Sequence, residues 1–186
     1  MKNLVSIFAC HDANISFWNA KTNKYYTIEI ERLVKKRYFR LHEDNTHLEQ
    51  RAILEKCRDI AANDWGIEND YEAVLISSDG YIQTEPTSIF NTESVKTVAS
   101  HHQTHAASAF YMSPFDRALI VSYDGGGDDG HFNVYYAHED GIKHLEKIPS
   151  DFGGGYLLCG SLIREVAEKS RHQLALSGKL MGLCGY

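Results

Sequence analysis

The sequence predicts an α/β protein in which one structural plan occurs twice. Two observations support this. Three short strand-like segments follow one another near the start of the chain, and three more follow from residue 118. A helical stripe of apolar residues comes after each triplet. We therefore expect a first lobe over residues 1–117, which includes a histidine-bearing helix, and the beginning of a second lobe over residues 118–186.

The first copy predicts three strands, which span residues 4–9, 15–18 and 25–31. A polar turn at His11 and Asp12 separates the first two strands. Thr46 and Glu49 have the spacing of a capping box, so a helix should begin there. A further strand is expected after that helix, over residues 73–77.

The second copy repeats this order of elements. Its three strands are expected at residues 118–121, 132–136 and 142–148, and a helical stripe follows at 157–166. The copy stops at Tyr186, before the strand that follows the helix in the first copy. The second lobe is therefore expected to be incomplete.

Two histidines between the copies predict a metal-binding pair. Ser100 and Gln103 have capping-box spacing, so a helix should begin at His101. His101 and His105 would then share one helix face and could aim their imidazoles at one point. Neutral imidazole suits iron and zinc. The alternative is a polar helix start that holds no ion.

A glycine run after the first strand of the second copy predicts an anion-binding turn. Asp124 ends that strand, and Gly125, Gly126 and Gly127 would let backbone N–H groups approach a phosphate. A strand follows, not a helix, so a Walker loop and a dinucleotide fingerprint are not expected. The alternative is an ordinary glycine-rich hairpin. With the histidine pair, Asp124 would form a 2-His-1-carboxylate set for iron(II), with zinc as the competitor.

Composition narrows the class of protein. The chain has 186 residues, 43% of them hydrophobic and 24% charged, and its net charge is −6. These values favour a folded core and argue against disorder and bulk nucleic-acid binding. The four cysteines form no CxxC pair, so we expect a reduced, cytoplasmic setting. No apolar run reaches the length of a membrane span.

The repeated meander, helix and strand resemble the ribonuclease-H-like halves of sugar kinases, actin and the heat-shock ATPases. Those folds bind ATP between two lobes, and an acidic turn from each lobe faces the phosphates. The resemblance implies that Asp12 lies in the first such turn and Asp124 in the second. It is a likeness of fold plan alone.

Four motifs resemble, in order, the O-carbamoyltransferases that act on antibiotics and nodulation factors. They are HDANISFW (11–18), IERLVKKR (30–37), the block from HHQTH to GDDG (101–130), and SGKLMGLCGY (177–186). The resemblance implies transfer of a carbamoyl group from carbamoyl-adenylate to an acceptor hydroxyl. In the family, a second domain makes this adenylate from carbamoyl phosphate and ATP.

The resemblance also implies roles for individual residues. His101, His105 and Asp124 match an iron-like metal site, whose second aspartate would lie beyond Tyr186. The glycines match a phosphate-facing loop, so phosphate contacts are implied for Gly125, Gly126, Gly127 and Asp128. Arg32 could add positive charge, since guanidinium forks match phosphate oxygens, and Lys179 could approach the nucleotide. His11 is the candidate base, and Asp12 either orients it or acts as the base. Arg32 could instead belong to a solvated strand end, and Lys179 could be a surface lysine after a Gly178 cap.

Departures from the family pattern limit the expected function. Ser177 replaces the usual glutamate, and Cys184 and Gly185 replace the usual Ala-Pro. We expect a fragment of a longer protein that lacks the C-terminal adenylating domain and is incomplete alone. The acceptor would be an unknown small molecule with a hydroxyl group. The alternatives are a non-catalytic nucleotide- or metal-binding remnant, and a kinase of the same fold, which does not need the histidine pair.

Overall fold

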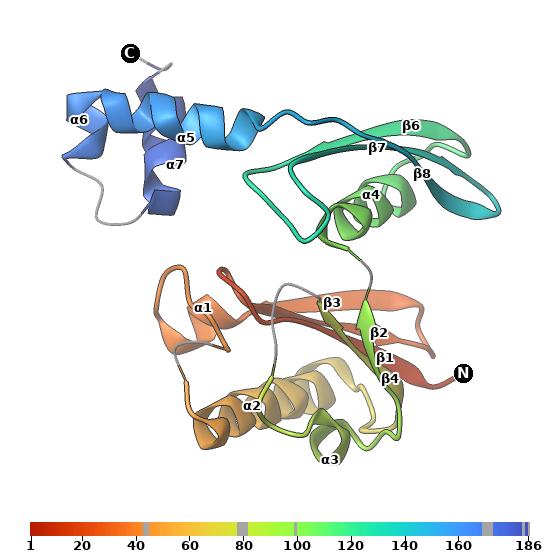
Figure 1. Ribbon diagram of the computed structural model, residues 1–186. Helices are drawn as coiled ribbons and strands as arrows, with labels where there is room; N and C mark the ends of the chain where they lie inside the picture. Colours follow the sequence, from red (N-terminus) through yellow and green to blue (C-terminus); the bar gives the residue numbers. More distant parts are fainter. Residues whose placement is uncertain (43–44, 78–81, 99, 169–172, 184, 186) are drawn as a thin grey trace. The chain divides into compact units, whose positions relative to one another are not determined.

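The computed structural model describes residues 1–42, 45–77, 82–98, 100–168, 173–183 and 185, and it shows a mixed α/β protein (Figure 1). The chain divides into two compact units, Met1–Ser100 and His101–Tyr186, which we call unit 1 and unit 2. The sequence placed the boundary after residue 117. The division falls earlier because the histidine-bearing helix packs on the strands that follow it. The assignment of the units as lobes of a larger domain stays a prediction.

Unit 1 is built on a mixed sheet with the strand order β3-β2-β1-β4-β5. The first three strands form an antiparallel meander, and β4 runs parallel to β1 and β5. The strands are β1 (Asn3–Phe8), β2 (Asn14–Asn19), β3 (Lys24–Glu29), β4 (Tyr71–Ser77) and β5 (Val95–Val98). The predicted meander and fourth strand are confirmed, whereas β5 was not predicted.

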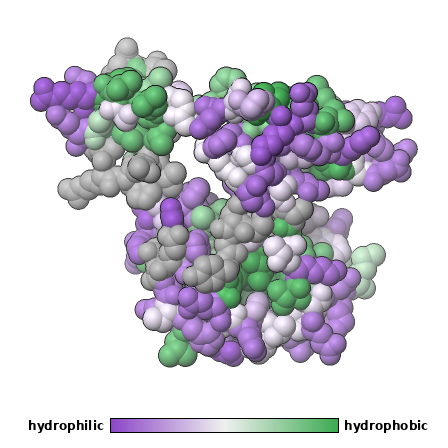
Figure 2. Space-filling model, viewed as in Figure 1, coloured by the Kyte–Doolittle hydropathy of each residue, from purple (hydrophilic) through white to green (hydrophobic). Residues whose placement is uncertain are grey.

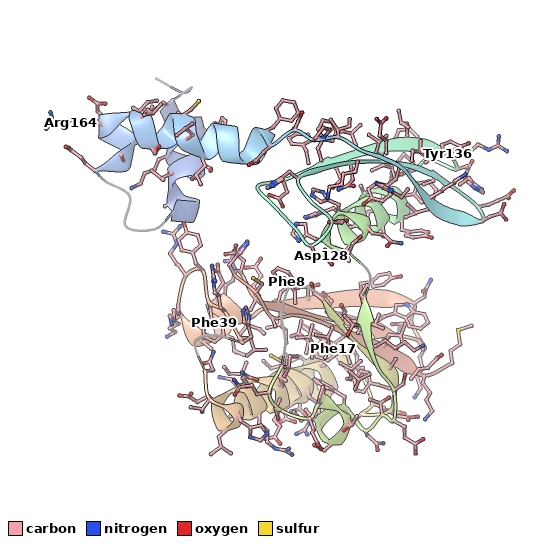
Figure 3. All side chains as sticks on the ribbon, viewed as in Figure 1. Phe8, Phe17, Phe39, Asp128, Tyr136 and Arg164 are labelled. Carbon is pink, nitrogen blue, oxygen red and sulfur yellow. The ribbon has the colours of Figure 1, made fainter. Side chains whose placement is uncertain are left out.

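The helices of unit 1 pack on one face of this sheet, and helix, strand and loop residues together form the core. They are α1 (Ile30–Val34), α2 (His47–Trp65) and α3 (Pro86–Phe90). The predicted Thr46–Glu49 capping box starts α2, with both of its reciprocal hydrogen bonds present. Leu54, Cys57 and Ala61 recur at helical spacing and pack in the same core as Phe17. Phe17 lies within unit 1 in Figure 3.

One strand of the first copy ends earlier than predicted. The third strand was expected to reach residue 31, but β3 ends at Glu29 and the chain turns into α1. The buried Ile30 accounts for this, because its N–H donates to the carbonyl of Ala13 and its side chain enters the core. The alternating pattern in the sequence therefore extends past the end of β3 into the start of α1.

Unit 2 begins with α4 (His101–Tyr111), which lies on a three-stranded antiparallel sheet of order β6-β7-β8. The strands are β6 (Ala118–Tyr123), β7 (Phe132–His138) and β8 (Gly141–Lys147), which confirms the predicted second meander. Ala106 and Phe110 of α4 pack against Ile120, Tyr135 and Ala137. On the opposite face Leu119 and Val121 are exposed, and the ring of Phe152 lies near Tyr123.

Three helices follow the second meander, α5 (Phe152–Leu162), α6 (Arg164–Ala167) and α7 (Gln173–Leu183). The predicted stripe at 157–166 is thus split at Ile163. Gly178 lies inside α7, so the cap proposed there is wrong. Apolar side chains gather on the surface of these helices (Figure 2), among them Leu158, Leu162 and Met181. Among the described helices, none is long and apolar enough to cross a membrane.

Candidate metal centre

His101 and His105 open α4 and lie on one side of it, as their spacing predicts. Their Nε2 atoms are 3.1 Å apart. The side chain of His101 is largely covered, whereas that of His105 is more than half exposed. The pair therefore presents two imidazole nitrogens at one point, one held by its surroundings and one open to solvent.

Asp124 follows β6 directly and completes the group. Its Oδ2 atom lies 3.0 Å from His101 Nε2 and 3.5 Å from His105 Nε2. One ligand atom from each of the three side chains lies within 4.8 Å of the other two. The structure thus brings together the three side chains that the sequence grouped from distant positions.

This donor set fits a divalent metal ion. Metal bonds of about 2.0–2.2 Å, set near right angles, place neighbouring nitrogen and oxygen donors roughly 3 Å apart. The separations between these three donors, 3.0, 3.1 and 3.5 Å, are close to that value. Two imidazoles and one carboxylate suit iron(II) with open positions, and zinc accepts the same donors.

Space for a ligand lies beside the donors. A cavity of about 420 Å³ is lined by His105, Ala109 and the segment from Ile120 to Asp124. It therefore runs along β6, an edge strand of the sheet, and ends at two of the three donors. A bound ion would be within reach of a molecule in this cavity.

Asp124 is held in its charged form by its neighbours. Hydrogen bonds with His101 and then His105, together with one from the Gly125 N–H, lower the pKa of Asp124 well below its usual range. Partial burial acts in the opposite direction but is the smaller effect. A carboxylate that stays ionised at neutral pH is the form that binds a cation.

The glycine run forms the loop between β6 and β7. A Cβ at Gly127 would lie 2.6 Å from the Cβ of His101, so only glycine fits there. The Gly125 N–H donates to Asp124 Oδ1 at 2.6 Å. Gly126 lies beside the ring of His131. The run thus allows the loop to approach the start of α4 closely, which is a role that the sequence did not assign to it.

The two aspartates after the glycines cap α4. Asp128 Oδ1 accepts the His101 N–H at 2.7 Å, and Asp129 accepts the His102 N–H at 3.1 Å. Asp128 lies beside the start of the helix in Figure 3. Within the described residues, no hydrogen bond joins Ser100 to Gln103, so the capping box predicted there is replaced by these carboxylates. Asp128, whose carboxylate was predicted to contact a phosphate, is thus hydrogen-bonded to the start of α4.

A second glycine-rich segment reaches the same loop, and the sequence analysis missed it. Asp151 caps α5 by accepting the Gly154 N–H at 2.6 Å. A Cβ at Gly153 would lie 2.4 Å from the Gly125 nitrogen, so α5 begins against the glycine loop. The signal available was DFGGGY at 151–156, an acidic residue and three glycines directly after the second meander.

His11 and Asp12 lie in the turn after β1 in unit 1. His11 Nδ1 is 2.9 Å from Asp12 Oδ2, and both side chains are exposed in part. Asp12 has a φ of 58°, in the left-handed region that aspartate tolerates better than most residues. The two candidate catalytic residues are therefore in contact with each other.

The two predicted basic phosphate contacts lie elsewhere in their units. Arg32, in α1, forms an ion pair with Glu29, so part of its charge is already matched within unit 1. Lys179 lies in α7 and is partly buried. Their contact with a nucleotide stays a prediction.

Residues 68–186 match the family model described as the carbamoyltransferase N-terminus. The chain belongs to this family. The match includes all three candidate metal ligands and the glycine loop, and it begins after the turn that holds His11 and Asp12.

Curated relatives match shorter stretches. The chain is similar to the nodulation protein NolNO of Sinorhizobium fredii, at 33% identity over 47% of the chain and 12% of that protein. It is similar to the nodulation protein NolO of Bradyrhizobium diazoefficiens, at 55% identity over 16% of the chain and 5% of that protein. An uncharacterized protein of Synechocystis matches at 34% identity over 24% of the chain and 9% of that protein. The matched region is therefore a small part of each relative.

Proposed function

We propose that this chain forms the first part of the transferase module of a carbamoyltransferase, which moves a carbamoyl group from carbamoyl-adenylate to an acceptor hydroxyl. The observation that carries the proposal is the convergence of His101, His105 and Asp124 in a member of this family. The strand order of unit 1, a meander followed by a helix and a parallel strand, supports the ribonuclease-H-like plan. Unit 2 would begin the second lobe.

The reaction assigns work to the chain's own residues. The acceptor hydroxyl loses its proton, its oxygen bonds to the carbamoyl carbon, and the bond from that carbon to the phosphate oxygen breaks to release AMP. His11 is the candidate base, because Asp12 lies against its Nδ1 and leaves Nε2 for the hydroxyl. The test for this role is loss of transfer in His11→Gln.

His101, His105 and Asp124 would hold the ion. A divalent metal would supply positive charge to the phosphate or the carbamoyl oxygen of the donor. The glycine loop would place backbone N–H groups near the same phosphate. The loop itself carries Asp124, Asp128 and Asp129, and Asp151 caps the helix that begins against it, so a bound anion would need a cation beside it.

The experiment that tests this function combines metal content with turnover. The full chain is loaded with Fe²⁺ without oxygen or with Zn²⁺, and is supplied with carbamoyl phosphate, ATP, an added adenylating domain and a panel of small hydroxyl compounds as carbamoyl acceptors. Acceptor-dependent AMP release is followed, with the adenylating domain alone as the blank. We expect one metal ion per chain and AMP release that both disappear in His105→Ala. Metal binding without any turnover would support the non-catalytic remnant instead, and absence of both would overturn the metal-assisted transferase.

A further inference from the structure

The histidine between the two candidate ligands is buried, and no step of the proposed reaction uses it. His102 has 0% of its surface exposed, although His101 and His105 on either side of it face the candidate site. An imidazole without hydrogen-bond partners is costly to bury, so the partners of His102 indicate its role.

Both ring nitrogens of His102 are satisfied by unit 2 itself. Nε2 is 2.9 Å from the Gly130 carbonyl, which can only accept, so Nε2 carries the proton. Ser122 Oγ is 2.8 Å from Nδ1, and its hydroxyl donates to that nitrogen. One side chain therefore joins α4 to β6 through Ser122 and to the end of the glycine loop through Gly130.

These are the elements that carry the candidate ligands. Ser122 lies on β6, two residues before Asp124, which follows that strand, and His102 follows His101 on α4. The carboxylate caps from Asp128 and Asp129 join the loop to the same first turn of α4. The hydroxyl of Tyr135 in turn donates to Asp129, at 3.3 Å. The elements that hold the ligands are thus connected by hydrogen bonds, of which the one between His102 and Ser122 is buried and the others are partly or fully exposed.

We propose that His102 is a positioning residue, which fixes the distance between the imidazoles of His101 and His105 and the carboxylate of Asp124 by joining α4 to β6 and the glycine loop. This inference rests on the proposed function, since it assumes that the three side chains bind a metal. Outer partners that orient ligands typically change metal affinity by 10- to 100-fold when they are lost.

Co²⁺ tests this role because its visible absorption bands report ligand geometry. The full chain and its variants are titrated with Co²⁺ alone, and affinity and band positions are recorded together with the melting temperature. We expect His102→Leu to weaken Co²⁺ binding at least about tenfold and to shift the bands. His102→Gln can still donate to Gly130 and should recover part of the affinity.

Two further variants separate positioning from general destabilisation. His42 of unit 1 is also buried and lies 2.8 Å from a backbone carbonyl, that of Ala9, so His42→Leu is the matched control. It should leave the Co²⁺ bands unchanged even if it lowers the melting temperature. Ser122→Ala removes only the hydroxyl bound to His102 and serves if His102→Leu does not fold. It should shift the bands and weaken binding several-fold.

The outcomes distinguish the two proposals. Wild-type affinity and bands in folded His102→Leu, or in Ser122→Ala if that variant alone folds, would overturn the positioning role. If His105→Ala abolishes binding in the same series, the metal site stands without it. If the wild-type chain binds no Co²⁺, the proposed metal site fails, and the positioning role falls with it.

Discussion

The sheets of the two units begin with the same three-stranded meander but bury it differently. In unit 1, Val5, Ile7 and Phe17 lie in a core with α2, and each is at most 1% exposed. In unit 2, α4 covers one face, and Leu119 and Val121 on the other face are 66% and 50% exposed. Helices cover one face of the sheet in each unit, but among the described residues the core on that face has 17 buried residues in unit 1 and five in unit 2.

The turns between the first two strands also differ. In unit 1 the turn is short, and its polar groups, His11 and Asp12, contact each other. In unit 2 the turn is a longer loop, and its carboxylates reach the start of α4 at His101. Apolar packing thus stabilises unit 1. In unit 2, hydrogen bonds between the β6–β7 loop and α4 position the candidate metal ligands.

The largest expected effect is on the core of unit 1. Phe17→Ala removes a fully buried ring that lies near Trp65, Tyr71 and Phe90, and should lower the free energy of unfolding by about 3–5 kcal/mol. Leu119→Ala on the exposed face of the second sheet should cost at most about 1 kcal/mol. Denaturant unfolding compares them, and equal losses would contradict the difference in burial.

A methyl group at Gly127 should disturb the candidate site next. Gly127→Ala would place its Cβ against His101, so the loop or α4 must move, and Fe²⁺ affinity should fall at least about tenfold. Gly125→Ala is the matched control, because a Cβ there meets no heavy atom within 4 Å. Isothermal titration with Fe²⁺ measures both, and similar affinities in the two variants would show that close approach at Gly127 is not needed.

Lowering the pH should reduce the stability of unit 2, because Asp124 becomes protonated. Its pKa is lowered in the folded chain by His101 and His105, so its stabilising contribution is fully present above the ordinary value of 3.8 and is lost as the pH falls further towards the folded value. Asp124→Asn should reduce the slope of unfolding free energy against pH below about pH 4. Asp140→Asn, at the exposed pair with His138, is the control. An unchanged slope in Asp124→Asn would contradict this assignment.

The smallest expected effect on stability distinguishes the two predicted capping boxes, at Thr46 and at Ser100. Thr46 caps α2, so Thr46→Ala should cost about 1 kcal/mol. Ser100→Ala should cost close to nothing, because Asp128 and Asp129 cap α4. Thermal unfolding of the two variants measures both losses of stability. A larger loss for Ser100→Ala than expected would contradict capping by the aspartates and favour the predicted capping box.

Much of the fold was predictable because its signals are local. The meanders follow from alternation and turn residues, and α2 follows from Thr46, Glu49 and an apolar stripe. The short β5 (Val95–Val98) has no such signal, since its first three residues are exposed and only its pairing with β4 defines it. The end of β3 depended on the burial of Ile30, which alternation alone does not reveal.

The sequence predicted the ligands of the candidate site but not the residues that position them. Helical spacing grouped His101 with His105, and a strand end placed Asp124. The partners of His102, Ser122 and Gly130, lie 20 and 28 residues away, and no motif joins them. The role of Asp128 was likewise decided by three-dimensional contact with α4. Long-range hydrogen bonds leave little pattern in a single sequence.

X-ray absorption of the Fe²⁺-loaded chain shows directly whether His101, His105 and Asp124 bind one metal ion. We expect one iron per chain with two imidazole ligands and oxygen donors, and loss of that iron in Asp124→Ala. A chain that binds no iron, or one whose iron keeps the same ligands in Asp124→Ala, would contradict this expectation.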